Sequence, residues 1–159
     1  MGDKKTPVFI VFVWCGLGCM DGHLMKAPVV EIAAVVVHYG AVLLVKRVCS
    51  AGEICWSLPL AVLPWGGCLQ RCVEREVLAA TGVVIRSGAV LHGYGRMVSA
   101  ADGAVTEHSV VIEMEADYLG GELQPGAAVL DAAWVSALAI ATLDVDEKCL
   151  ELLVDIGFI

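Results

Sequence analysis

Arg75 and Glu76 are charged neighbours in the segment CLQRCVEREVLAATGV, residues 68 to 83. On a helix, Glu76, Ala79 and Ala80 would share an arc of roughly 100°, because they are spaced at i, i+3 and i+4. Three carboxylates on such an arc could hold a divalent cation, since hard ions such as Mg²⁺ prefer oxygen ligands. Only Glu76 is a carboxylate here, so a cation would need further ligands.

Glu113 and Glu115 are the candidates for those further ligands. They alternate with apolar residues in a run from Val105 to Tyr118, so a strand would point both to the same face. The predicted metal site is therefore Glu76, Glu113 and Glu115. In the alternative interpretation, Arg75 and Glu76 form only a structural ion pair.

Three residues are candidates for substrate binding. Arg47 at a strand end could contact a phosphate, and Trp65 and Tyr94 could stack on a base. A solvated strand end is the alternative for Arg47. The isolated histidines lack a nucleophile pattern and are interpreted as structural: His38, His92 and His108.

The spacing predicts one helix from residue 68 to 82 as the element that positions Arg75 and Glu76. Leu69, Val73 and Val77 share one apolar stripe, which should face a core. Gly82 follows Thr81 and gives the usual helix end, because glycine adopts the left-handed conformation at little steric cost.

Short β-branched runs on both sides of this helix predict a sheet. Residues 29–37 and 42–47 form a predicted hairpin, and Asp102-Gly103 is a hairpin signal between runs 89–98 and 105–118. Shorter strands are expected at 83–85 and 131–135. Two helices are expected at 136–141 and 145–156, the second with Asp144 as its N-cap.

The stretch LAVLPWGG, residues 60–67, is predicted to be a loop of unusually apolar composition. We expect it either to cover the site beside the helix as a plug or to contact another chain.

Composition and charge limit the partners. Of 159 residues, 58% are hydrophobic and 18% are charged, and the formal net charge is −8. A nucleic-acid partner is not expected, because phosphate binding needs clustered Lys and Arg. The apolar excess predicts an association surface and a homodimer.

The cysteines and the N-terminal apolar run bear on compartment and domain organisation. Seven cysteines without framework spacing predict thiols of a reducing compartment and hence a cytoplasmic protein, with a zinc site at Cys15/Cys19 or Cys68/Cys72 as the alternative. Residues 8–14, VFIVFVW, imitate the start of a secretory signal but are too short to span a bilayer. We expect an apolar strand or extension at 1–27, a single domain at 28–159 and no membrane partner.

Together these motifs resemble a degenerate Nudix box. Trp56-Ser57-Leu58-Pro59 is similar to the family's lead-in, and Arg75-Glu76-Val77 with Gly82-Val83 is similar to the second half of G-x5-E-x7-R-E-U-x-E-E-x-G-U. In this alignment, non-acidic residues stand at the remaining glycine and glutamate positions: Ala61, Gly67, Ala79 and Ala80.

The resemblance implies a Nudix-type α/β/α sandwich with a mixed, curved sheet. It also implies hydrolysis of a nucleoside diphosphate derivative with Mg²⁺ or Mn²⁺, with Arg75 and Glu76 as the candidate catalytic residues. With the acidic cluster largely lost, we predict a weak or inactive hydrolase that acts as a binding or assembly module for a nucleotide-like small molecule and holds Mg²⁺ or Mn²⁺ only if it is active. The alternatives are an active Mg²⁺-dependent hydrolase of an ADP-ribose-like compound or a nucleoside triphosphate, and an engineered chain in which alanines replace the glutamates.

Overall fold

A computed structural model describes residues 27–49 and 52–159 of the chain. The expected N-terminal strand, its cysteines and its place in the domain organisation lie outside this part. The elements, in chain order, are β1 (Val29–His38), β2 (Ala41–Val48), β3 (Ile54–Ser57), β4 (Leu60–Val62), α1 (Leu69–Thr81), β5 (Val83–Ser99), β6 (Val105–Gly121), β7 (Asp131–Ser136), α2 (Ala137–Ile140) and α3 (Glu147–Asp155).

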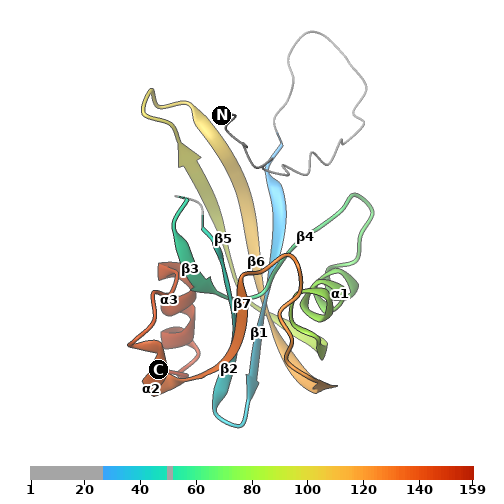
Figure 1. Ribbon diagram of the computed structural model, residues 1–159. Coiled ribbons are helices and arrows are strands. Elements are labelled where there is room, and N and C mark those ends of the chain that lie inside the picture. Colours follow the sequence, from blue (N-terminus) through green and yellow to red (C-terminus); the bar gives the residue numbers. More distant parts are fainter. Residues whose placement is uncertain (1–26, 50–51) are drawn as a thin grey trace, which may run out of the picture.

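The sheet is mixed, with β1 near its centre. β1 runs parallel to β6 and antiparallel to β4 and β2, and β6 pairs antiparallel with β5. β2 also carries β3 and β7. Figure 1 shows this curved sheet with α1 on one face and α2 and α3 on the other. The predicted α/β/α sandwich is therefore confirmed.

Strand alternation divides the apolar residues between two cores. In β1, Ile32 and Ala34 are fully buried toward α1, whereas Ala33 and Val35 are buried toward α3. Successive side chains of a strand point to opposite faces, so this single strand supplies both cores. The same alternation in β6 decides which face of the sheet each polar side chain reaches.

The central helix matches its prediction closely. Val73 and Val77 of α1 are buried against the sheet. Gly82 has a φ of 71° and donates its N–H to the carbonyl of Leu78 at 2.8 Å. The left-handed glycine therefore ends the helix as expected.

Two boundaries differ from the predictions. Residues 83–99 form one continuous strand, β5, with irregular pairing between Ser87 and Val90 instead of a break. The N-cap of α3 is Asp146 and not Asp144, because the Asp144 carbonyl instead accepts the N–H of Trp56 at 2.7 Å. Asp144 is thereby tied to β3, and the helix begins two residues later.

The apolar stretch 60–67 is only partly a loop. Residues 60–62 form β4, in which Ala61 is buried, and Leu63 packs against the core under α1. Trp65 is 90% exposed, so it does not plug the site beside the helix.

The prediction that all cysteines are thiols is wrong for one pair. Cys49 and Cys55 form a disulfide that closes the loop between β2 and β3, with their Cα atoms 6.1 Å apart. Cys68, Cys72 and Cys149 are free among the described residues. None of the helices in this part of the chain has the length and apolarity needed to cross a membrane.

Candidate functional site

Arg75 and Glu76 form an ion pair on the outer side of α1. The Oε1 atom of Glu76 accepts from Nε and Nη2 of Arg75, at 3.1 and 3.0 Å. The two side chains are 64% and 42% exposed, so the pair contributes little to stability. The ion pair involves one of the two carboxylate oxygens of Glu76.

Glu113 and Glu115 lie on the opposite face of the sheet from Arg75 and Glu76. Met114 between them is buried in the core under α1, so both glutamates point toward the α3 side. The structure therefore does not bring Glu76 together with the other two predicted metal ligands.

The residues around Glu76 do not fit a multi-carboxylate magnesium site. Ala79 and Ala80 offer no side-chain oxygen, and the loop after β6 packs directly on this turn of α1, where Gly126 donates its N–H to the carbonyl of Ala80 at 2.8 Å. Across residues 27–49 and 52–159, the one group of three or more His, Cys, Asp or Glu ligands is Cys49, Cys55 and Asp146.

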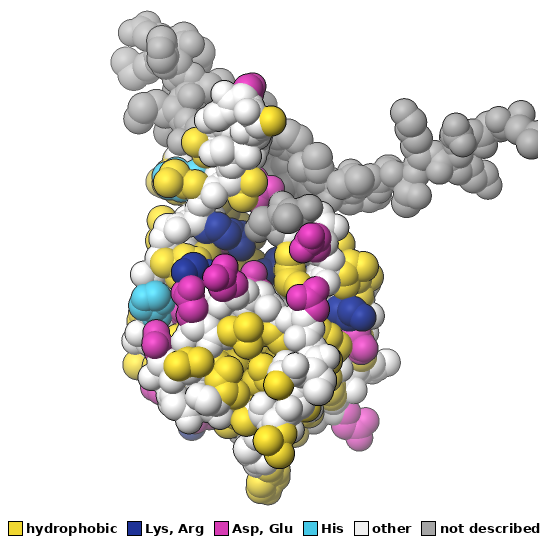
Figure 2. Space-filling model, turned by 90° about the vertical axis from the view of Figure 1, so that its left-hand side faces the viewer, with side chains coloured by type: hydrophobic (Ala, Val, Ile, Leu, Met, Phe, Trp, Pro, Cys, Tyr) yellow, Lys and Arg dark blue, Asp and Glu magenta, His cyan; other side chains and the backbone are white. Residues whose placement is uncertain are grey.

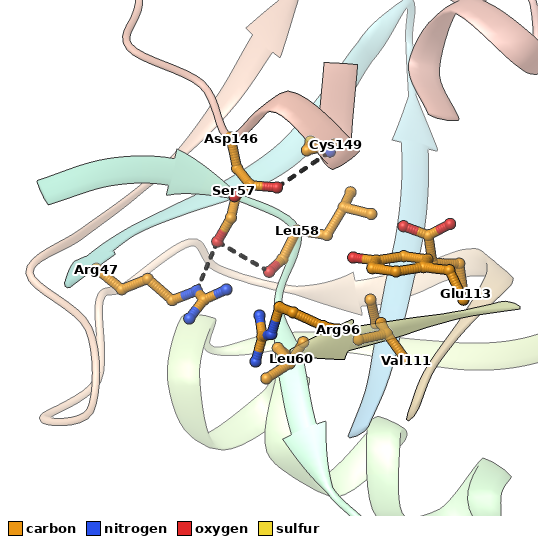
Figure 3. A pocket seen from close by; sticks show the side chains of 11 residues that line it. Arg47, Ser57, Leu58, Leu60, Arg96, Val111, Glu113, Asp146 and Cys149 are labelled. Atoms are coloured by element: carbon orange, nitrogen blue, oxygen red, sulfur yellow. Dashed lines mark hydrogen bonds between the residues drawn. The ribbon is translucent and has the colours of Figure 1, made fainter. Parts of the chain in front are cut away.

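A cleft opens between the sheet and the start of α3, on the face that α1 does not cover (Figure 3). It encloses about 300 Å³ up to its open mouth, and its inner part has room for little more than a water molecule. Its polar lining consists of Arg47, Ser57, Tyr94, Arg96, Glu113 and Asp146.

Two arginines line one wall of this cleft, and the carboxylates of Glu31 and Asp146 lie close enough to act on their charge. Arg47 donates from Nε to Oγ of Ser57 at 2.7 Å, and Arg96 pairs with the buried Glu31 at 2.5 Å. Burial lowers the pKa of Arg47, and the positive charge of Arg96 lowers it further. The Nε atom of Arg96 is buried without a hydrogen-bond partner. An anion at this wall would offset the repulsion between the two guanidinium groups.

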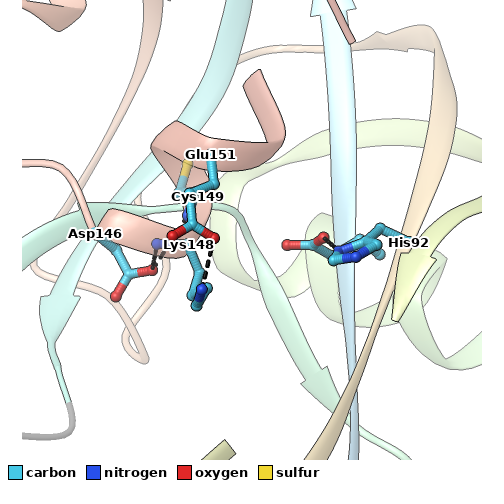
Figure 4. A network of polar contacts seen from close by, with 6 residues as sticks. His92, Asp146, Lys148, Cys149 and Glu151 are labelled. Atoms are coloured by element: carbon cyan, nitrogen blue, oxygen red, sulfur yellow. Dashed lines mark hydrogen bonds and ion pairs between the residues drawn. The ribbon is translucent and has the colours of Figure 1, made fainter. Parts of the chain in front are cut away.

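The opposite wall carries neutral and acidic groups. Glu113 is 2% exposed, and burial raises its pKa, although His92 opposes this with Nδ1 lying 3.3 Å from Oε2. Burial and the charge of Glu113 raise the pKa of Tyr94 to about 12, so its hydroxyl stays protonated. Figure 4 shows the His92 contact and, toward α3, Asp146 with the Lys148–Glu151 pair.

The structure unites two of the three predicted substrate-binding residues. Arg47 and Tyr94 both line the cleft, whereas Trp65 stands exposed before α1. Sequence reasoning missed Arg96, although it lies two residues after Tyr94 on one strand and so shares its face. It also missed Glu31, the partner of Arg96.

The surface of the α3 side shows the same separation of charge. In Figure 2, Lys and Arg side chains gather in the hollow beneath the projecting end of the β5–β6 hairpin, with acidic side chains beside them. Apolar side chains spread over the surface below this hollow.

Comparison with known proteins adds information at the level of the fold. No protein-family model and no curated protein matches the sequence. Among solved structures, the MutT NUDIX hydrolase from Burkholderia pseudomallei has a TM-score of 0.68 at 24% identity, covering 83% of this chain and 100% of its own. A NUDIX hydrolase from Nitrosomonas europaea has a TM-score of 0.65 at 19% identity, covering 82% and 88%.

A third likeness involves a structure with a bound ligand. The NUDIX domain of Shewanella oneidensis NrtR, complexed with ADP ribose, has a TM-score of 0.63 at 24% identity, with 82% of this chain and 87% of that chain covered. The strand order, the position of α1 and these likenesses lead to one conclusion. The chain has the Nudix fold.

Proposed function

We propose that the chain is a Nudix-fold binding protein for a phosphate-bearing, nucleotide-like small molecule, with little or no pyrophosphohydrolase activity. The observation that carries this proposal is the pair Arg47 and Arg96, which faces a cleft while the only carboxylate at the box positions on α1, Glu76, is bound by Arg75. Mg²⁺ is usually held by one or two carboxylates together with the substrate's phosphates, and the carboxylate of Glu76 is paired with Arg75, whereas binding an anion needs only the cleft.

Because the inner part of the cleft has room for little more than a water molecule, a phosphate group would bind at its open mouth, with the rest of the ligand outside. A phosphate beside Arg47 and Arg96 would offset the repulsion between their two guanidinium groups. Arg47 would supply a second charge-assisted hydrogen bond. Tyr94 offers a ring face and a protonated hydroxyl, and Glu113 can accept hydrogen bonds from hydroxyl or N–H groups.

Isothermal titration calorimetry with ADP-ribose, ADP and inorganic phosphate tests the binding proposal. ADP-ribose is the first probe because the Shewanella NUDIX domain was solved with it. We expect Arg47→Met to weaken binding about tenfold or more, since it removes a charge-assisted contact. Arg86→Met is the matched control, because Arg86 is exposed and pairs with Asp117 away from the cleft. Absence of binding, or equal affinity in Arg47→Met, would refute the proposal.

Turnover separates this proposal from the active hydrolase. Product release from ADP-ribose and nucleoside triphosphates with Mg²⁺ or Mn²⁺ is expected to stay at background. Turnover that Glu76→Gln abolishes would instead establish the alternative, a hydrolase that uses Glu76. The double substitution Ala79→Glu with Ala80→Glu should strengthen cation binding, and an unchanged affinity would count against the box alignment.

We also propose that the protein forms a homodimer, for which the exposed apolar residues of α2 and α3 provide the support. Leu138 is 90% exposed and Val154 is 58% exposed, and a dimer interface on this side would remove both side chains from water. Sedimentation velocity should show a dimer that Leu138→Asp weakens, and a clean monomer would refute it. Cytoplasmic location stays a prediction.

A further inference from the structure

Cys49, Cys55 and Asp146 form a compact group of potential metal ligands at the outer edge of the cleft. Their ligand atoms all lie within 4.8 Å of one another. In a tetrahedral zinc site with Zn–S bonds of about 2.3 Å, two thiolates stand about 3.8 Å apart. We propose that the reduced Cys49–Cys55 pair, together with Asp146, binds a thiophilic divalent cation of the zinc type.

The backbone around these residues holds the three side chains in place. Cys55 lies opposite Arg47 in the β2–β3 ladder, and Cys49 donates its N–H to the carbonyl of Glu53 at 2.7 Å. Asp146 donates its N–H to the carbonyl of Trp56 at 2.8 Å, which ties the start of α3 to β3. These bonds fix the backbone of the three residues before a cation binds, so binding loses little further conformational entropy.

One oxygen of Asp146 is left for a cation. Its Oδ1 atom accepts the N–H groups of Lys148 and Cys149, at 3.1 and 3.3 Å, and so caps α3. Oδ2 has no hydrogen-bond partner among the described residues. Two thiolates and one carboxylate oxygen supply three ligands, and water would complete a four-coordinate site, as in open zinc centres.

The disulfide and the metal site exclude each other, so the cation binds only after reduction. An external dithiol exchanges with the disulfide, becomes a disulfide itself and gives two electrons and two protons to Cys49 and Cys55. Binding of the cation then releases these two thiol protons to solvent. Because the two thiolates offset the two positive charges of the cation, the net charge beside the arginine wall of the cleft stays the same.

Metal binding to the full chain tests this inference. Protein reduced with dithiothreitol under argon, and then freed of it, is titrated with Zn²⁺ against a chromophoric chelator and separately with Co²⁺. We expect about one cation per chain and a cobalt–thiolate charge-transfer band in reduced protein, with neither in oxidised protein. Cys15 and Cys19 lie outside the described residues, so both the native chain and its Cys15→Ser/Cys19→Ser variant are measured.

The variants distinguish this site from general thiol binding. Cys49→Ser and Cys55→Ser should weaken binding at least a hundredfold, and Asp146→Asn about tenfold, since asparagine preserves the helix cap but loses the charge. Cys68→Ser is the matched control at an exposed free cysteine and should change nothing. Should Cys49→Ser fail to fold, Asp146→Asn and the cobalt spectrum decide. No binding after reduction, or an affinity that Asp146→Asn leaves unchanged, would overturn the proposal.

Discussion

Arg96 and Glu31 give the sharpest test of how the cleft is built. Their ion pair joins β5 to β1, and the side chains are only 25% and 12% exposed. Arg96→Met removes the cation and leaves the Glu31 carboxylate buried without its partner. The double variant Glu31→Met/Arg96→Met removes both charges and keeps similar side-chain volumes.

The expected magnitudes follow from burial. Breaking one side of a fully buried pair costs roughly 3–5 kcal/mol, and the partial exposure of this pair reduces the expected cost of Arg96→Met to about 2–3 kcal/mol. For a domain of this size, that corresponds to a fall in Tm of about 10 °C. The double variant should stay within about 1 kcal/mol of the native protein, because no unpaired charge remains.

Urea and thermal unfolding of the native protein, both single variants and the double variant measure the coupling between the two charges. Arg86→Met/Asp117→Met provides the control, since that pair is 68% and 73% exposed and should contribute under about 0.5 kcal/mol. Calorimetry then separates stability from function, because the double variant should fold yet fail to bind ADP-ribose. If Arg96→Met destabilises no more than the double variant, the two charges do not interact and the reasoning fails.

Three further predictions concern single positions. Burial raises the pKa of Glu113 above its ordinary value of 4.5, so ionisation of this side chain opposes folding. The free energy of unfolding of Glu113→Gln, measured in urea, should therefore exceed that of the native protein by an amount that grows from pH 4 to pH 7. A difference that stays constant with pH would contradict this. Gly82→Ala should lower the free energy of unfolding by about 2 kcal/mol in thermal unfolding, since a Cβ there would stand 2.5 Å from the Glu122 carbonyl oxygen at a φ of 71°. Gly103→Ala is the control, because Gly103 has a φ of 83° but no atom within 4 Å of such a Cβ, and it should cost less. Equal losses in the two variants would exclude the clash. Asp146→Ala should destabilise the protein by about 1 kcal/mol in chemical denaturation, and Asp146→Asn by much less, because asparagine keeps the N-cap of α3. Equal losses in the two variants would contradict a role of this cap in stability.

Local patterns predicted the elements well, because each depends on residues close in sequence. The stripe containing Val73 and Val77 and the glycine at position 82 define α1, and the turn at Asp102-Gly103 defines the β5–β6 hairpin. Asp144 and Asp146 illustrate the limit of local patterns. Both precede the same helix, and β3 fixes where the chain turns into it, because Trp56 bonds to the backbone of both residues and leaves the side chain of Asp146 to accept the N–H groups of Lys148 and Cys149.

The candidate site was less predictable, because it depends on which face of the sheet each residue reaches. Alternation places Glu113 and Glu115 together, but nothing in the spacing says that Met114 rather than Glu113 faces α1. Arg96 is recognised as a buried ion-pair residue only once the fold brings it to Glu31, which lies 65 positions away in the sequence. Assignments that need a tertiary neighbour were therefore the ones that sequence reasoning missed.

The parallel pairing of β1 with β6 has a consequence for synthesis on the ribosome. Val29 of β1 pairs with Ser109 of β6, and Val36 pairs with Ala116. The pairing of β1 with β6 can therefore form only after most of the chain has been translated. Such long-range pairing slows folding and leaves apolar strand edges uncovered in the meantime. A nascent chain stalled before β6 should therefore be the form that chaperones capture, and release should follow once that strand leaves the exit tunnel.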